Sequence, residues 1–234
     1  GLIYTFYLRE GVTFHDGTPF NAQAVGANLD RIVDPETASQ KARYMLGPYT
    51  NYEIVDDYTI RIVLAEPYTP LLDALSQVYL GMASPTAFNE YSRNRYQFYQ
   101  VGTGPFRFVE YVPNDRIVIR RAENYAWGPT YYETPSENSV DEIVFRFFED
   151  EATRLLAIES GDVDVMGELP PTDARALSGN SQISLYPVDV PGQPLQFMFN
   201  TQQFPTDNSI VRQALIIATN RNAIVDTVFQ GFSA

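Results

Sequence analysis

Three carboxylates within seven residues are the side chains best suited to chemistry in this chain: Asp162, Asp164 and Glu168. A pair of carboxylates can serve as general acid and base, or can hold a cation. The apolar residues 163–166 predict a short strand, in which alternation would place Asp162 and Asp164 on the same side. A solvated strand edge or a helix-cap bond would account for the same residues. The stretch is therefore a candidate site with two open interpretations.

The single histidine, His15, is either a metal ligand or a turn residue. One histidine without cysteine cannot build a transition-metal site alone, so the spacing favours a His15-Asp16-Gly17 turn. The absence of cysteine excludes disulfides and thiolate catalysis in these 234 residues. Ser84 and Ser160 lack a Gly-x-Ser-x-Gly context, and residues 102–105 lack the Gly-Lys-Ser/Thr of a P-loop. These patterns therefore predict no metal site, no cofactor, no serine triad and no phosphate-binding loop.

Composition limits the classes of partner. The 234 residues are 44% hydrophobic and 19% charged, which is typical of a globular protein. The net charge of −13 argues against nucleic acid or an anionic membrane as the main partner. No apolar run is long enough to predict a membrane span. Aromatic residues make up 14%, which fits either a tyrosine-rich core or a cleft lined with rings.

The opening segment predicts a scaffold of strands, turn and helix. Residues 3–8 and 12–14 alternate apolar and polar side chains, as half-buried strands do. Asn21 is placed to cap a helix whose apolar positions fall on one face. Further strands are expected at residues 52–55, 59–64, 106–112, 116–121, 142–147, 163–166, 183–188 and 195–199. Further helices are expected at residues 70–76, 85–93, 152–160, 172–178, 209–219 and 222–229.

Several of these elements carry finer expectations. In the helix at 70–76, Leu71, Leu72 and Leu75 should point inward, and Thr172 should cap the helix that follows it. From residue 142 onward strands alternate with helices, which predicts a partly parallel α/β sheet.

Five segments occur in the order found in one known family. They are LREGVTFHDGTPFNAQAV at 8–25, VGTGPF at 101–106, RAENYAWGP at 121–129, IESGDVDV at 158–165, and Asn200, Phe204-Pro205, IVRQAL at 210–215 and Asn220-Arg221. Together they resemble the family 5 extracytoplasmic solute-binding proteins, the oligopeptide-, dipeptide- and nickel-binding components of bacterial importers. Phe106 and Asn220 stand where that family usually has Tyr and Asp, and the spacing before Trp127 is unusual.

The resemblance implies a fold and a domain plan. In that family two lobes close around a solute. We expect an α/β fold: a periplasmic-binding-protein-like lobe, with a mixed sheet and flanking helices, plus a smaller α+β subdomain. Residues 1–100 would form the small subdomain, 101–208 the middle of the first lobe, and 209–234 the start of the second. The chain is expected to be a fragment of a longer two-lobed protein, with most specificity residues on the second lobe.

The resemblance also implies solute contacts. The residues after 158–165 and the stretch 190–196 correspond to segments that approach the ligand in peptide-binding relatives. A weaker expectation concerns the small subdomain. Gly192 and Gln193 would suit close backbone approach, although the neighbouring prolines could simply begin a strand. The expected solute-binding residues are Tyr44, Met45, Met166, Gly167, Glu168, Val190, Gly192, Gln193 and Gln196.

The function implied is a non-enzymatic receptor of an ABC importer, periplasmic or extracellular, that closes on a peptide and delivers it to a membrane permease. A lipid anchor before residue 1 stays open, and we expect a monomer. Alternatives are the same fold binding a nickel chelate, an oligosaccharide or an opine. Outside that class, Asp162, Asp164 or Glu168 could serve a hydrolase, or the domain could be a regulatory scaffold without a ligand.

Overall fold

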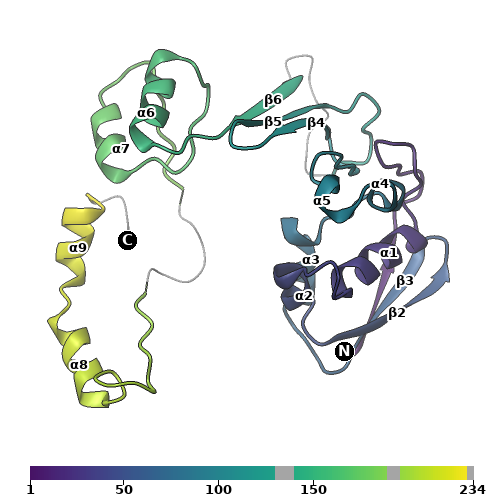
Figure 1. Ribbon diagram of the computed structural model, residues 1–234, viewed down its shortest axis with the longest axis horizontal. Helices are drawn as coiled ribbons and strands as arrows, with labels where there is room; N and C mark the ends of the chain where they lie inside the picture. The colour runs from purple at the N-terminus through teal and green to yellow at the C-terminus, as the bar shows by residue number, and fades with distance from the viewer. Residues whose placement is uncertain (130–139, 189–195, 231–234) are drawn as a thin grey trace. The chain divides into compact units, whose positions relative to one another are not determined.

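The computed structural model describes residues 1–129, 140–188 and 196–230, and the chain divides into two compact units, Gly1–Phe147 and Phe148–Ala234 (Figure 1). The first unit holds two small antiparallel sheets with helices, and the second holds helices. The expected fold class, mixed α/β, is confirmed. The domain boundaries expected at residues 100 and 208 stay a prediction.

Helix α1, Ala22–Val33, forms the predicted amphipathic element. The Asn21 side chain accepts a hydrogen bond from the Ala24 amide at 2.9 Å, which satisfies one of the free N–H groups of the first turn. Val25 and Leu29 lie in the core, and Leu29 is 0% exposed. The predicted cap and the apolar face are both confirmed.

The first sheet has the order β1-β3-β2 and packs its buried face against α1. Its strands are β1, Ile3–Tyr7; β2, Tyr49–Asp56; and β3, Thr59–Leu64. Alternate residues of β3 enter the core: Ile60, Ile62 and Leu64. The predicted hairpin between β2 and β3 is confirmed.

The strand predicted at residues 12–14 is wrong. Only Thr13 makes an isolated bridge, to Pro19. The segment closes on itself, because the Phe14 amide donates to the Thr18 carbonyl and the Phe20 amide donates to the Val12 carbonyl. A tight loop of this kind uses the backbone groups that a strand would offer to a neighbour.

Short helices follow the first sheet. They are α2, Gln40–Met45; α3, Leu71–Ser76; the 3₁₀ helix η1, Val78–Leu80; α4, Pro85–Glu90; and α5, Arg93–Tyr96. Ser84 caps α4, and the helix ends at Glu90, before the predicted end at residue 93, because Tyr91 is extended. In α3, Leu71 is buried while Leu72 is 58% exposed, so the inward orientation predicted for Leu72 is wrong.

The second sheet, of order β4-β5-β6, matches the prediction closely. Its strands are β4, Phe106–Val112; β5, Arg116–Arg121; and β6, Glu142–Arg146. Every strand pair in the described residues is antiparallel, so the partly parallel pairing expected from residue 142 is not found. The reason is that β6 pairs antiparallel with β5, the strand that precedes it in the chain, whereas a parallel pair needs a crossover connection.

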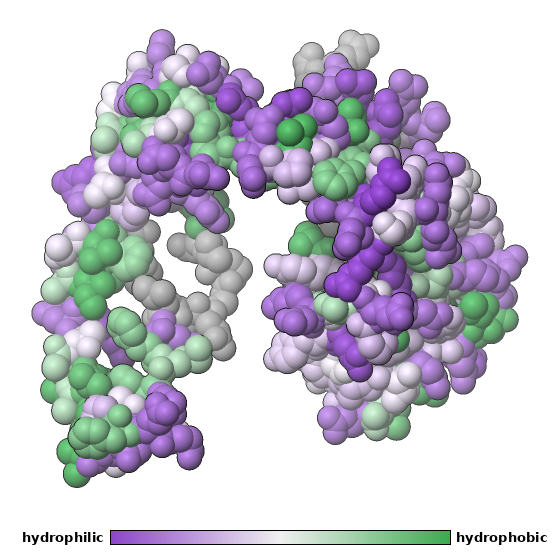
Figure 2. Space-filling view, in the orientation of Figure 1, coloured by the Kyte–Doolittle hydropathy of each residue, from purple (hydrophilic) through white to green (hydrophobic). Residues whose placement is uncertain are grey.

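The second unit contains α6, Glu151–Ser160; α7, Pro171–Leu177; α8, Ser209–Ala218; and α9, Arg221–Val228. Side chains of Asp150, Asn208 and Asn220 cap α6, α8 and α9, and Gly161 ends α6 with a φ of 79°. Thr172 does not cap α7, because that helix already begins at Pro171. Figure 2 shows hydrophobic side chains on the surface of α8 and α9, where no residue is buried.

The strands predicted at 163–166, 183–188 and the described part of 195–199 are wrong. A strand needs a neighbouring backbone, and these segments pair with no strand in the described ranges. Instead, the Val163 amide donates to the Ala157 carbonyl and the Ile183 amide donates to the Asn180 carbonyl. The alternation that placed Asp162 and Asp164 on one face therefore has no basis.

Replacing the central core residue of α1 should destabilise the first unit. Leu29→Ala removes a fully buried side chain, and we expect the free energy of unfolding to fall by about 2–5 kcal/mol. Leu72→Ala is the matched control, with an expected change of about 0.5 kcal/mol or less at an exposed position. Urea denaturation followed by circular dichroism measures both, and equal losses would contradict this description of the core.

Candidate functional site

The turn at His15 joins two distant parts of the first unit. His15 Nε2 lies 2.9 Å from the Gly104 carbonyl oxygen, and the His15 amide donates to the Gly102 carbonyl at 3.0 Å. A carbonyl only accepts, so Nε2 carries the proton. The turn interpretation is confirmed. Among the described residues no group of three or more metal-ligating side chains is found.

A buried serine lies beside this turn. Ser84 is 0% exposed, and its hydroxyl donates to Asp16 Oδ2 at 2.5 Å. Asp16 Oδ1 accepts from the Thr18 amide at 2.9 Å. Partial burial by itself would raise the pKa of Asp16, but these hydrogen bonds from Ser84 and Thr18 outweigh it and lower the pKa below its ordinary 3.8. Asp16 is therefore a charged acceptor at neutral pH.

A second buried polar side chain, Asn28, ties α1 to the same region. Its Nδ2 donates to the Ala24 and Ala83 carbonyls, at 2.9 and 2.8 Å, and its Oδ1 accepts from the Ala83 amide at 2.9 Å. The amide thus fixes the backbone immediately before Ser84. A buried amide with both ends paired specifies one geometry.

Trp127 completes the connections of the loop at 101–105. Its indole N–H donates to the Thr103 carbonyl at 2.8 Å, and Arg9 donates to the Trp127 carbonyl at 2.6 Å. Segments 8–25, 101–106 and 121–129, which carry the family resemblance, therefore meet at one place. We call this set of contacts the motif junction; it comprises Arg9, His15, Asp16, Asn28, Ser84, Thr103, Gly104 and Trp127. It positions backbone, and nothing in it has the arrangement of a catalytic centre.

The predicted solute contacts of the small subdomain lie on α2. Tyr44 is 78% exposed, whereas Met45 is half-buried against the core. Lys41, one turn before Met45, places its ammonium 5.6 Å from the Tyr79 ring centroid, so η1 lies beside α2. Tyr79 and Val78 are also exposed. The structure thus places one exposed ring, Tyr44, on α2 and another, Tyr79, on the neighbouring η1, and the sequence pattern predicted neither helix.

The predicted contacts of the second unit follow α6. Met166 is half-buried, while Gly167 and Glu168 are exposed. Glu168 has a φ of 54°, which is uncommon for a residue with a side chain. The Asp162 and Asp164 carboxylates are exposed and belong to no strand, so no acid–base pair is formed by strand alternation.

The remaining predicted contacts come before α8 in the chain. Gln196 is described and exposed. Val190, Gly192 and Gln193 lie outside the described residues. The solute-binding role of all nine predicted residues stays a prediction: the structure places Tyr44 and Met45 together on α2, and Met166, Gly167 and Glu168 together in one loop.

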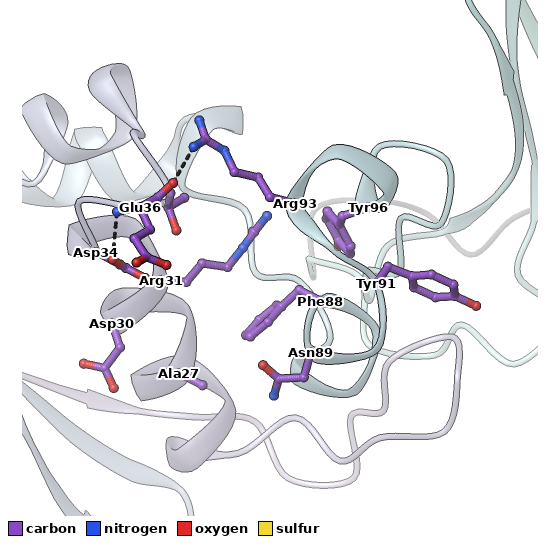
Figure 3. A pocket seen from close by; sticks show the side chains of 11 residues that line it. Ala27, Asp30, Arg31, Asp34, Glu36, Phe88, Asn89, Tyr91, Arg93 and Tyr96 are labelled. Carbon is purple, nitrogen blue, oxygen red and sulfur yellow. Dashed lines mark hydrogen bonds between the residues drawn. The ribbon is translucent and has the colours of Figure 1, made fainter.

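One feature that the sequence analysis missed is a pocket of about 490 Å³ between α1 and α4–α5 (Figure 3). One side is lined by Ala27, Asp30 and Arg31, whose spacing of three and four residues puts them on one face of α1, and by Asp34, which follows the helix. That spacing was the available signal. That face is polar, whereas the apolar spacing of Val25 and Leu29 predicts only the buried face of the same helix.

No helix within the described ranges is long and apolar enough to cross a bilayer.

Comparison with known proteins shows which family this chain resembles. The chain matches the family model described as "Bacterial extracellular solute-binding proteins, family 5 Middle" over residues 1–234. It is 35% identical over 237 residues to the glutathione-binding protein GsiB of Escherichia coli strain K12, covering 100% of this chain and 44% of that protein.

Two solved structures are similar as well. The periplasmic binding protein DppA from Helicobacter pylori, in complex with the peptide STSA, has a TM-score of 0.75 and 26% identity over 99% of this chain and 47% of that one. The binding protein AgaA from A. tumefaciens R10, in complex with agropinic acid, has a TM-score of 0.74 and 28% identity over 98% of this chain and 44% of that one. The chain spans under half the length of these relatives.

The lowered pKa of Asp16 predicts how the free energy of unfolding depends on pH. Because the folded pKa lies below the unfolded value near 3.8, the Asp16 interactions stabilise the fold above about pH 4 and are lost as the pH falls through the folded pKa. We expect Asp16→Asn to lower the free energy of unfolding at pH 7 by about 1 kcal/mol, after allowance for solvent screening of this exposed residue.

Denaturant titrations at several pH values between 7 and 3 measure this effect. The difference between Asp16→Asn and the native protein should shrink toward the acid end. Glu10→Gln, at an exposed carboxylate that has no hydrogen-bond or ion-pair partner among the described residues, is the control and should show little change. A deficit for Asp16→Asn that stays constant with pH would contradict the proposed charge on Asp16.

Proposed function

Because the chain belongs to the family 5 bacterial extracellular solute-binding proteins, we propose that it forms part of a receptor that captures a small solute for an ABC importer. The observation that carries the proposal is the match to this family over the whole chain, together with 35% identity to a glutathione-binding protein. Glutathione and STSA are both peptides, so a short peptide is the solute class we propose.

The proposed mechanism is capture without chemistry. The solute is held between lobes that close around it, and its main-chain groups pair with backbone groups of the receptor. Closure changes the surface presented to the permease and so signals that the receptor is loaded. The receptor acts in the periplasm or outside the cell, as a monomer, and a lipid anchor would hold it near the permease.

The motif junction and α2 have different parts in this mechanism. The junction fixes the first unit through hydrogen bonds, most of them buried or partly buried, and we assign it no solute contact. Tyr44 offers an exposed ring on a short helix anchored by Ala42 and Leu46, which are both buried. A tyrosine ring on an anchored helix is suited to packing against a solute. The side chain has few rotatable bonds, so binding costs little conformational entropy.

A second candidate is the same receptor fold with another small solute. The AgaA structure with agropinic acid favours it, since that relative is comparably similar to this chain. An enzyme based on Asp162, Asp164 or Glu168 is the weaker alternative, because the three carboxylates are exposed.

The first experiment is mass spectrometry of the solute that co-purifies with the full-length protein and is released by denaturation. A set of short peptides, or glutathione, is expected. A single sugar, opine or metal complex would refute the peptide assignment and leave the receptor function in place. Turnover of the released compound by the purified protein would refute the receptor function itself.

The Tyr44 ring gives a second test. With the identified solute, or with glutathione as the probe, we expect Tyr44→Ala to weaken binding about tenfold, as loss of one packed ring does. The matched control is Tyr7→Ala, which removes a ring that is 82% exposed on β1. Calorimetry measures both, and equal affinities for the two variants would remove Tyr44 from the site.

A parallel comparison separates binding from chemistry at the carboxylates. Glu168→Gln should change solute affinity without any effect on turnover. Glu159→Gln, on the exposed side of α6, should leave solute affinity unchanged. Loss of a measurable turnover in the Asp164→Asn or Glu168→Gln variant would favour the hydrolase.

A further inference from the structure

The pocket between α1 and α4–α5 lies within the first unit and has no part in the function proposed above. Its volume of about 490 Å³ is in the range that holds small organic molecules. Figure 3 shows Arg31 reaching from α1 toward Phe88 and Tyr96, while Arg93 extends toward Glu36. Ala27 contributes only a methyl group to the pocket lining, so the pocket stays open next to this part of α1.

The Arg31 side chain is held in place by two rings. Its guanidinium carbon lies 5.1 Å from the Phe88 ring centroid and 4.8 Å from the Tyr96 centroid. Contacts of this kind engage the flat faces of the guanidinium and leave its edge free to donate. Within the described residues no hydrogen bond or ion pair of the Arg31 N–H groups to a protein acceptor is present. Arg31 is therefore a positioned cation with unused donors, ready for a planar carboxylate.

The other charged residues of the pocket limit what can bind. Arg93 donates to the Glu36 carbonyl and is already engaged. Asp34 Oδ1 accepts from the Glu36 amide at 2.9 Å, and Asp30 Oδ2 accepts from the Tyr52 hydroxyl at 2.8 Å, so each carboxylate has one oxygen committed and one left over. Three acidic and two basic side chains line the pocket. The carboxylates would repel a multiply charged anion. A molecule that carries one positive and one negative charge could pair with both kinds of side chain.

We propose that this pocket is a binding site for a small amino acid, whose carboxylate pairs with Arg31 and whose ammonium group faces Asp30 and Asp34. Asp30 and Arg31 belong to the α1 face that lines the pocket, and Asp34 follows the last residue of that helix, so both signs of charge line one side of the pocket. The space above Ala27 and beside Phe88 takes the side chain of the amino acid. The site is distinct from Tyr44 and Met45 on α2, and it does not depend on the identity of the transported solute.

The test uses the full-length protein and three probes: L-phenylalanine, L-leucine and L-glutamine. Binding is measured by calorimetry or by ligand-observed NMR, at probe concentrations up to about 10 mM. At least one probe is expected to bind. Its analogue without the amino group and its analogue without the carboxylate should each bind at least about tenfold more weakly.

Two variants act on the pocket by different means. Arg31→Gln removes the cation, and Ala27→Leu fills the space above α1 at a position that is only half-buried. Each should weaken amino-acid binding at least about tenfold and leave binding of the transported solute unchanged. Arg107→Gln, at an exposed arginine on β4, is the matched control and should change neither. Circular dichroism checks that each variant is folded.

Three results would overturn the proposal. The first is that none of the probes binds. The second is that a probe binds equally well to the native protein and to a folded Arg31→Gln variant. The third is that the analogue lacking the amino group binds as tightly as the amino acid, because the two aspartates would then have no role.

Discussion

The hydrogen bond from Ser84 to Asp16 is the interaction on which the arrangement of the first unit depends. Ser84 is fully buried, and a buried hydroxyl without a partner would cost about 1–3 kcal/mol. The same residue caps α4, and its amide donates to the Val101 carbonyl. One side chain thus connects the turn after Phe14, the start of α4 and the loop before β4. The orientation of α4 toward α1, and with it the pocket that holds Arg31, follows from this attachment.

Asn28 makes the attachment specific. Its amide pairs in both directions with Ala83, the residue before Ser84, and so α1 cannot slide along that backbone without breaking buried hydrogen bonds. His15 and Trp127 add hydrogen bonds to the carbonyls of Gly104 and Thr103. Three of the five segments by which the family is recognised, 8–25, 101–106 and 121–129, therefore meet in the contacts that hold the first unit together. The residues for which we propose solute contacts, such as Tyr44 and Glu168, are exposed and lie outside this set.

Local structure could be predicted from the sequence wherever its physical cause is local. Asn21 caps α1 and Gly161 ends α6 because each acts on amides or carbonyls within a few residues. The strands at 163–166 and 183–188 were predicted from the same kind of pattern and are wrong. Their apolar residues satisfy the pattern, but a strand also needs a second backbone, and none in the described ranges lies alongside them. Without a strand, alternation no longer places the Asp162 and Asp164 carboxylates on the same side of the backbone.

The sequence alone determined the family, the mixed α/β class and helix ends such as the cap at Asn21, since each depends on motif order or on neighbours in the chain. Tertiary structure decided the rest. It turned Leu72 outward and Leu71 inward, although both are leucines in one short helix. It also placed Arg31 between Phe88 and Tyr96, which lie more than fifty residues further along the chain. Such contacts depend on how α1 and α4–α5 pack, and packing is set by residues distant in sequence that no local pattern brings together.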